Sequence, residues 1–174
     1  MKKNTLRVVA LLIAIITVLS VTGCGMQPAT VPSENRVKIS DFGDKATGVE
    51  AICKTLKEKE FIPKKGECVK TNAELIGATK GYRIEGVTVH SSRFSIELYE
   101  FEDTTSELAQ KTIKSVKENG SFELFGRTVS YAYMSDNNKY LLVYPDKNSL
   151  SDKEKDAENV TRKDEVLKVL NSAK

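Results

Sequence analysis

The sequence predicts an α+β fold, in which a small antiparallel sheet of three or four strands carries helices packed mainly on one face. Phe94, Ile96 and Leu98 alternate with polar residues, which is the pattern of a half-buried strand. Elsewhere apolar residues recur every three or four positions, as they do on the buried face of a helix. Turn-forming residues at 135–138 join two β-rich segments, and such hairpins favour antiparallel pairing. Helices packed on a sheet are the natural way to bury its apolar face.

Apolar residues at helical spacing predict four helices, and their ranges are 44–61, 67–76, 105–117 and 161–172. In the first helix Val49, Ile52 and Leu56 fall on one face. Thr104 and Glu107 match a capping box at the start of the third helix. Strands are expected over residues 82–90, 94–101, 128–134 and 139–144. Together these elements predict one domain over residues 44–174.

The chain begins with Lys2, Lys3 and Arg7, and an apolar run follows from Val8 to Val21. A positive start, an apolar stretch and a small-residue cleavage site define a secretory signal. The apolar run is shorter than the ~20 residues that a membrane-spanning helix needs. The sequence therefore predicts an exported protein whose residues 1–23 form a signal peptide.

The apolar run ends in Val21-Thr22-Gly23-Cys24, which resembles the lipobox of bacterial lipoproteins. This resemblance implies cleavage before Cys24 and acylation of its thiol, for example by palmitate. It also implies a lipid anchor on the extracytoplasmic face of the cell membrane. The alternative is an uncleaved anchor in which Cys24 has no role. Residues 24–43 show little periodicity, and we expect the lipidated cysteine to be followed there by a flexible tether.

Two further segments, residues 73–78 and 97–101, are similar to small uncharacterised lipoproteins of Gram-positive bacteria. That similarity implies no activity.

The charge balance excludes one large class of partner. Cleavage before Cys24 removes three basic side chains and no acidic one from a chain with 27 basic and 24 acidic side chains, which leaves it formally neutral. Nucleic-acid-binding domains usually carry a basic patch, so we expect no nucleic-acid partner.

Cys53 and Cys68 remain when Cys24 carries lipid. Outside the cytoplasm two such thiols can form a disulfide, and we expect this pair to do so across the turn at Pro63–Gly66. The alternative is a pair of buried free thiols. Their spacing is not the C-x-x-C of redox enzymes. Because His90 is the single histidine, we expect no metal site and no cofactor.

Four tyrosines of the predicted hairpin are the best candidates for a binding surface, namely Tyr131, Tyr133, Tyr140 and Tyr144. Tyrosine is common at recognition surfaces because it adds contact area at a low entropic cost. The alternative is that these rings pack across the strands beneath a helix. A catalytic site is not expected, although His90 adjoins Ser91 and Ser92, because no G-x-S-x-G turn presents a nucleophile.

The favoured function is that of a non-enzymatic interaction domain tethered to the membrane, whose partner is an envelope protein or another membrane component. A small-ligand-binding lipoprotein is the alternative, and a concave pocket at Tyr131 and Tyr133 would support it. An envelope hydrolase that uses His90 with Ser91 or Ser92 is a third hypothesis, and it requires these side chains to lie within hydrogen-bond reach.

Overall fold

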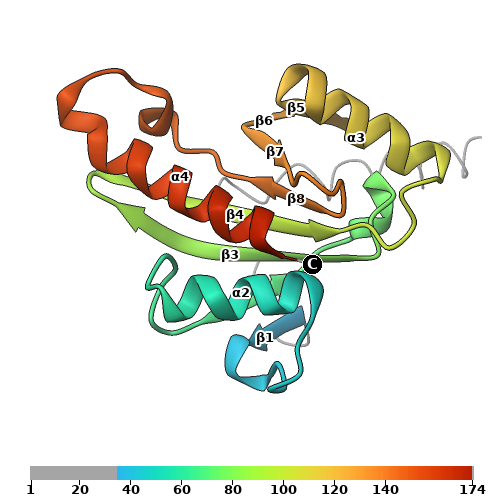
Figure 1. Cartoon of the computed structure of the whole chain (residues 1–174), viewed down its shortest axis with the longest axis horizontal. Coiled ribbons are helices and arrows are strands. Elements are labelled where there is room, and N and C mark those ends of the chain that lie inside the picture. The colour runs from blue at the N-terminus through green and yellow to red at the C-terminus, as the bar shows by residue number, and fades with distance from the viewer. Residues whose placement is uncertain (1–34, 174) are drawn as a thin grey trace, which may run out of the picture. The chain divides into compact units, whose positions relative to one another are not determined.

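The computed structural model describes residues 35–173 (Figure 1). The predicted signal peptide, Cys24 and most of the predicted tether lie outside the described residues. The folded part includes residues assigned to the tether, because Ile39 and Phe42 are buried in the core.

Most strands form one sheet, in which every pair is antiparallel and the order is β1-β2-β3-β4-β8-β7. These strands are β1 (Arg36–Lys38), β2 (Glu67–Lys70), β3 (Lys80–Val89), β4 (Ser92–Glu100), β7 (Ala132–Met134) and β8 (Tyr140–Val143). A separate hairpin consists of β5 (Ser121–Leu124) and β6 (Arg127–Ser130). The α-helices of the described residues are α2 (Gly48–Glu58), α3 (Glu107–Asn119) and α4 (Ala157–Ser172), and short 3-10 helices include η3 (Ala73–Ile76) and η4 (Lys147–Leu150).

Both faces of the sheet are covered. The first face packs against α2 and α4, and its core contains Val49, Leu56, Leu170, Ile84, Ile96, Leu98, Leu142 and Tyr144. The second face packs against α3 and the β5–β6 hairpin, and its core contains Ala109, Val116, Phe122, Tyr99, Phe101, Leu141 and Val143. Figure 1 shows α3 and this hairpin on the side of the sheet away from α2. Apolar side chains alternate between the faces as the pleat of a strand requires.

The α+β class and the antiparallel sheet are confirmed, but the expected number of strands is wrong, because the main sheet has six. The expected second helix, over 67–76, is also wrong. Its first half is β2, which pairs with both β1 and β3, and only η3 is helical. Cys68 and Val69 are neighbours that are both buried, as in a strand covered on both faces. Hydrogen-bonded pairing of β2 with a strand on each side outweighs the helical spacing of apolar residues in this short segment.

The predicted strand over 128–134 is divided in the structure. Tyr131 adopts a left-handed backbone with φ of 61°, and the chain passes there from β6 to β7. The hairpin of the main sheet therefore consists of β7 and β8 alone, and residues 128–130 belong to the β5–β6 hairpin.

The start of α3 also differs from the prediction. Ser106 is the N-cap, and its hydroxyl accepts a hydrogen bond from the backbone N–H of Ala109 at 3.4 Å. Thr104, the expected cap, lies outside the helix. Gly120 ends α3 with φ of 62°, the left-handed conformation typical of a glycine that follows a helix.

A carboxylate from the sheet caps α2. The residue before the helix, Thr47, makes no side-chain cap bond, and instead the Glu100 carboxylate accepts from the backbone N–H of Val49 at 3.1 Å. Gly48 has φ of 59°, and a Cβ atom at this position would lie within 2.5 Å of the Glu100 carboxylate. A negative charge at a helix N-terminus is stabilising, so Glu100 fixes α2 to the end of β4.

We predict that Glu100→Ala lowers the free energy of unfolding by about 1 kcal/mol, because the first turn of α2 loses its acceptor. Chemical denaturation measures this change. Glu102→Ala removes an exposed carboxylate two residues away and is the control, with an expected effect within about 0.5 kcal/mol. Equal effects of the two variants would contradict the capping role.

Candidate functional site

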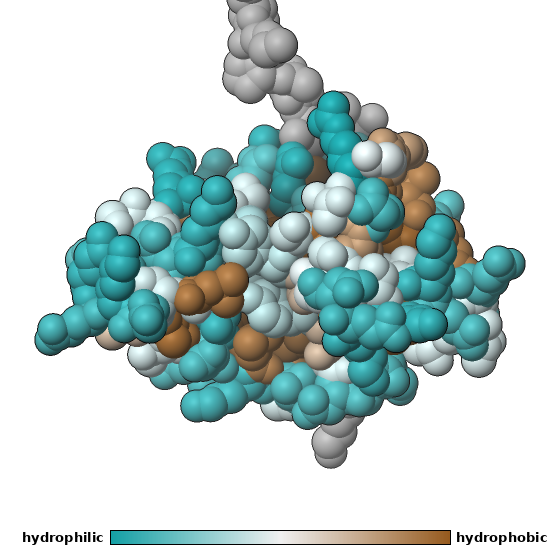
Figure 2. All heavy atoms as spheres, turned by 90° about the horizontal axis from the view of Figure 1, so that it is seen from above, coloured by the Kyte–Doolittle hydropathy of each residue, from teal (hydrophilic) through white to brown (hydrophobic). Residues whose placement is uncertain are grey.

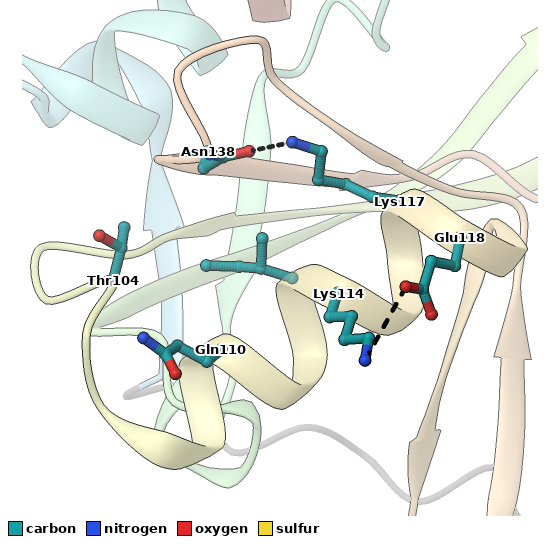
Figure 3. A pocket seen from close by; sticks show the side chains of 7 residues that line it. Thr104, Gln110, Lys114, Lys117, Glu118 and Asn138 are labelled. Carbon is teal, nitrogen blue, oxygen red and sulfur yellow. Dashed lines mark hydrogen bonds and ion pairs between the residues drawn. The ribbon is translucent and has the colours of Figure 1, made fainter.

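Most of the face shown in Figure 2 is hydrophilic, and its apolar atoms form separate patches. One groove of about 530 Å³ runs along the outer side of α3. Its walls come from α3, from the segment before it and from the turn before β8, and the lining residues are Thr104, Gln110, Ile113, Lys114, Lys117, Glu118 and Asn138 (Figure 3).

Helical geometry explains which side chains reach this groove. Ala109, Thr112, Ile113 and Val116 are buried and form the inner face of α3. Lys114 and Lys117 therefore fall on its outer face, while Ile113 lies at the boundary and contributes an apolar floor.

The charged groups of the groove are two ammonium groups and one carboxylate. Lys117 Nζ donates to Asn138 Oδ1 at 3.1 Å. Lys114 Nζ lies 4.0 Å from Glu118 Oε1, and these side chains are 74% and 58% exposed. An ion pair this exposed contributes little stability, so the Lys114 ammonium is readily available to another carboxylate. Gln110 and Thr104 add an amide and a hydroxyl at the other end of the groove (Figure 3). The arrangement suits recognition of anionic groups on another molecule.

The sequence did not single out Lys114 or Lys117. The available signal was their spacing of three residues in the predicted helix over 105–117. That signal is weak, because exposed lysines are ordinary on helices.

The prediction that four tyrosines form an exposed binding surface is wrong, because two of them are buried. Tyr140 and Tyr144 are 2% and 0% exposed, and both belong to the core beneath α2 and α4. The Tyr144 ring lies 4.9 Å from the Phe94 ring in an edge-to-face contact. Tyr133 packs against the same core, and burial raises the pKa of all three phenols. Tyr131 is the turning point between β6 and β7 rather than part of a strand.

A second groove, of about 400 Å³, lies where β7 meets the C-terminal ends of α3 and α4. Tyr133, Met134, Val116, Leu167 and Lys117 contribute to its lining. Thus Tyr133 lines a groove, as part of the predicted binding surface.

His90 and the neighbouring serines do not form a catalytic arrangement among the described residues. His90 Nδ1 lies 3.6 Å from the Glu158 carboxylate, and the imidazole is 57% exposed. Ser92 Oγ instead accepts hydrogen bonds from the side-chain amides of Asn148 at 2.9 Å and Asn159 at 3.3 Å. No hydrogen bond joins His90 to a serine within residues 35–173.

Asn159 anchors α4 to the sheet through a buried polar network. Its amide donates to the Asp146 carboxylate at 2.8 Å and to the Val89 carbonyl at 3.3 Å. Asn159 and Asp146 are 0% and 2% exposed. The hydroxyl of Ser92 belongs to this network as an acceptor for the side-chain amides of Asn148 and Asn159.

The disulfide expected between Cys53 and Cys68 is not formed in the structure, where both are free thiols. Cys53 lies on α2 and Cys68 on β2, and they share the first core. Cys68 Sγ is 3.6 Å from the Val37 carbonyl. Burial raises the pKa of the Cys68 thiol to about 11 and that of the Cys53 thiol well above its usual range. Because the thiolate is the reactive form, both cysteines are inert in the folded domain.

Within residues 35–173 no three His, Cys, Asp or Glu side chains are grouped so as to hold a metal ion. None of the helices described there has the length and apolar character needed to cross a membrane. Comparison with known proteins finds no matching family model, no similar curated protein and no similar solved structure.

We predict that iodoacetamide, used without reductant, modifies neither Cys53 nor Cys68 in the folded protein, because both thiols are buried and protonated. After unfolding in guanidinium chloride both thiols should react, and intact-mass spectrometry should show two groups more than on the folded protein. A protein that gains no further group on unfolding would contain the disulfide instead.

Proposed function

We propose that this chain is a lipid-anchored, non-enzymatic interaction domain of the bacterial cell envelope. In this proposal Cys24 carries the lipid and the folded domain contacts an envelope protein. The short stretch of sequence between Cys24 and the folded domain supports this proposal, because residues 25–35 span at most about 40 Å even when fully extended. The anchor would therefore keep the domain close to the membrane surface and raise its local concentration there.

The observation that carries the proposal is the open groove along α3. Small-molecule sites usually enclose most of their ligand in a concave cavity. The α3 groove is open at the surface instead, with ammonium, amide, hydroxyl and carboxylate groups along an exposed helix. Such donors complement the carboxylates of an acidic protein segment, and complementary charge favours both specificity and rapid association.

The small-ligand alternative is favoured by one observation, the groove at Tyr133 with its apolar lining. Against it, Tyr140 and Tyr144 fill the inner side of the hairpin that would have formed the pocket. The hydrogen bonds that Ser92 accepts from two side-chain amides count against the hydrolase hypothesis. They occupy the hydroxyl that would act as the nucleophile.

For the anchor, we predict that Cys24→Ala leaves the fold intact but abolishes membrane retention and the capture of the partner. In-cell crosslinking of the full chain, followed by purification and mass spectrometry, measures the capture. One protein recovered in stoichiometric amount with the wild type, and lost with the variant, is the expected result. Full activity of the unlipidated, secreted variant would contradict the tethered role.

For the α3 groove, we predict that Lys117→Glu reduces capture of that partner several-fold. Lys117 lines both this groove and the groove at Tyr133, and the substitution reverses its charge. The unfolding free energy should fall by about 1 kcal/mol or less, since the exposed side chain loses only its hydrogen bond to Asn138 and a favourable charge in the last turn of α3. Lys111→Glu is the matched control, because Lys111 is an exposed residue of the same helix outside the groove. Equal losses with both variants would indicate a general charge effect and contradict a groove-specific contact.

A further inference from the structure

The turn between β5 and β6 presents an aromatic ring to solvent. Leu124 pairs with Arg127, so Phe125 and Gly126 form a two-residue turn. Phe125 is 80% exposed, which is more than the other exposed large apolar side chains, Leu75, Leu108 and Leu150. The hairpin already has its core contact in Phe122, which is 2% exposed. The ring of Phe125 is therefore not needed to attach the hairpin to the domain.

The backbone of Phe125 is strained as well. Phe125 and Gly126 have φ of 50° and 71°, which is the pattern of a type I′ turn. Asn or Asp is strongly preferred at the first of these positions, while a bulky residue at positive φ is an outlier. Phe125 thus combines an unfavourable backbone with an unfavourable exposure. Strain of this kind persists where function requires the side chain.

We infer that the β5–β6 turn is a protein-contact site, in which Phe125 inserts into an apolar pocket of the partner and Arg127 pairs with a carboxylate beside that pocket. This inference rests on the proposed interaction function and names the chemistry of the partner. Arg127 is exposed and makes no ion pair within the described part of the chain. Aromatic and arginine side chains are the commonest hot spots of protein interfaces.

The charge of the hairpin favours a protein partner over the membrane surface. Within β5 and β6 Arg127 is the one cationic side chain and Glu123 is acidic. Membrane-binding surfaces are instead rich in Lys and Arg.

Site-specific crosslinking tests this contact directly. A photoreactive benzoylphenylalanine replaces Phe125 in the full chain, which keeps an aromatic ring at the turn, and the same group at Leu150 on η4 is the control. The expected result is one protein adduct from position 125, absent from position 150, that maps to an apolar surface bordered by Asp or Glu. A lipid adduct, or no adduct above the control, would overturn the inference.

A second variant separates binding from folding. Phe125→Asn places the preferred residue in the turn, so its melting temperature should equal or exceed that of the wild type. Binding to the purified partner should nevertheless weaken at least about tenfold, as for a hot-spot residue, while Leu150→Asn should bind normally. Unchanged binding by Phe125→Asn would overturn the inference alone. Failure of the wild type to capture any partner by general lysine crosslinking would instead overturn the proposed function together with it.

Discussion

Burial of β4 and β8 on both faces is the constraint on which the rest of the structure depends. Leu98 and Leu142 point into the first core, and their neighbours Tyr99 and Leu141 point into the second. Covering both faces requires helices or hairpins on both sides, so α2 and α4 lie on one side and α3 with β5–β6 on the other. The carboxylate of Glu100 at the end of β4 then fixes where α2 begins.

The central elements could be predicted because their patterns are long and regular. The inner stripes of α2 and α3 and the alternation along β4 indicate these elements correctly. The elements at the edge could not be predicted, because three or four residues carry too little periodicity. Thus β1 falls in the segment assigned to the tether, and β2 in a segment read as helical. Only pairing between residues distant in sequence makes these segments strands.

The candidate surfaces were harder to predict than the fold. Tyr140 and Tyr144 are four residues apart, at the start of β8 and just after it, so they share one face of the predicted strand. The residues between them, Leu141, Leu142 and Val143, are buried as well, so the sequence pattern did not report exposure. Lys114 and Lys117 carried no pattern beyond that of any exposed helix face. Phe125-Gly126 did carry a signal, a glycine between two β-rich segments, yet a phenylalanine before it is not the usual residue of such a turn. The positive φ of Phe125 in the structure shows that this unusual residue does occupy the first position of the turn.

The two proposed contact surfaces of the described domain are the α3 groove and the β5–β6 turn, and both depend on the proposed membrane anchor. The mass of the N-terminal peptide of the protein, extracted from the membranes of a Gram-positive host, tests that anchor most directly. We predict a mature chain whose first residue is Cys24, carrying fatty acyl groups either directly on the thiol as a thioester or on a glyceryl group joined to the thiol as a thioether. A mature chain that retains residues before Cys24, or that begins at Cys24 without lipid, would contradict the proposal.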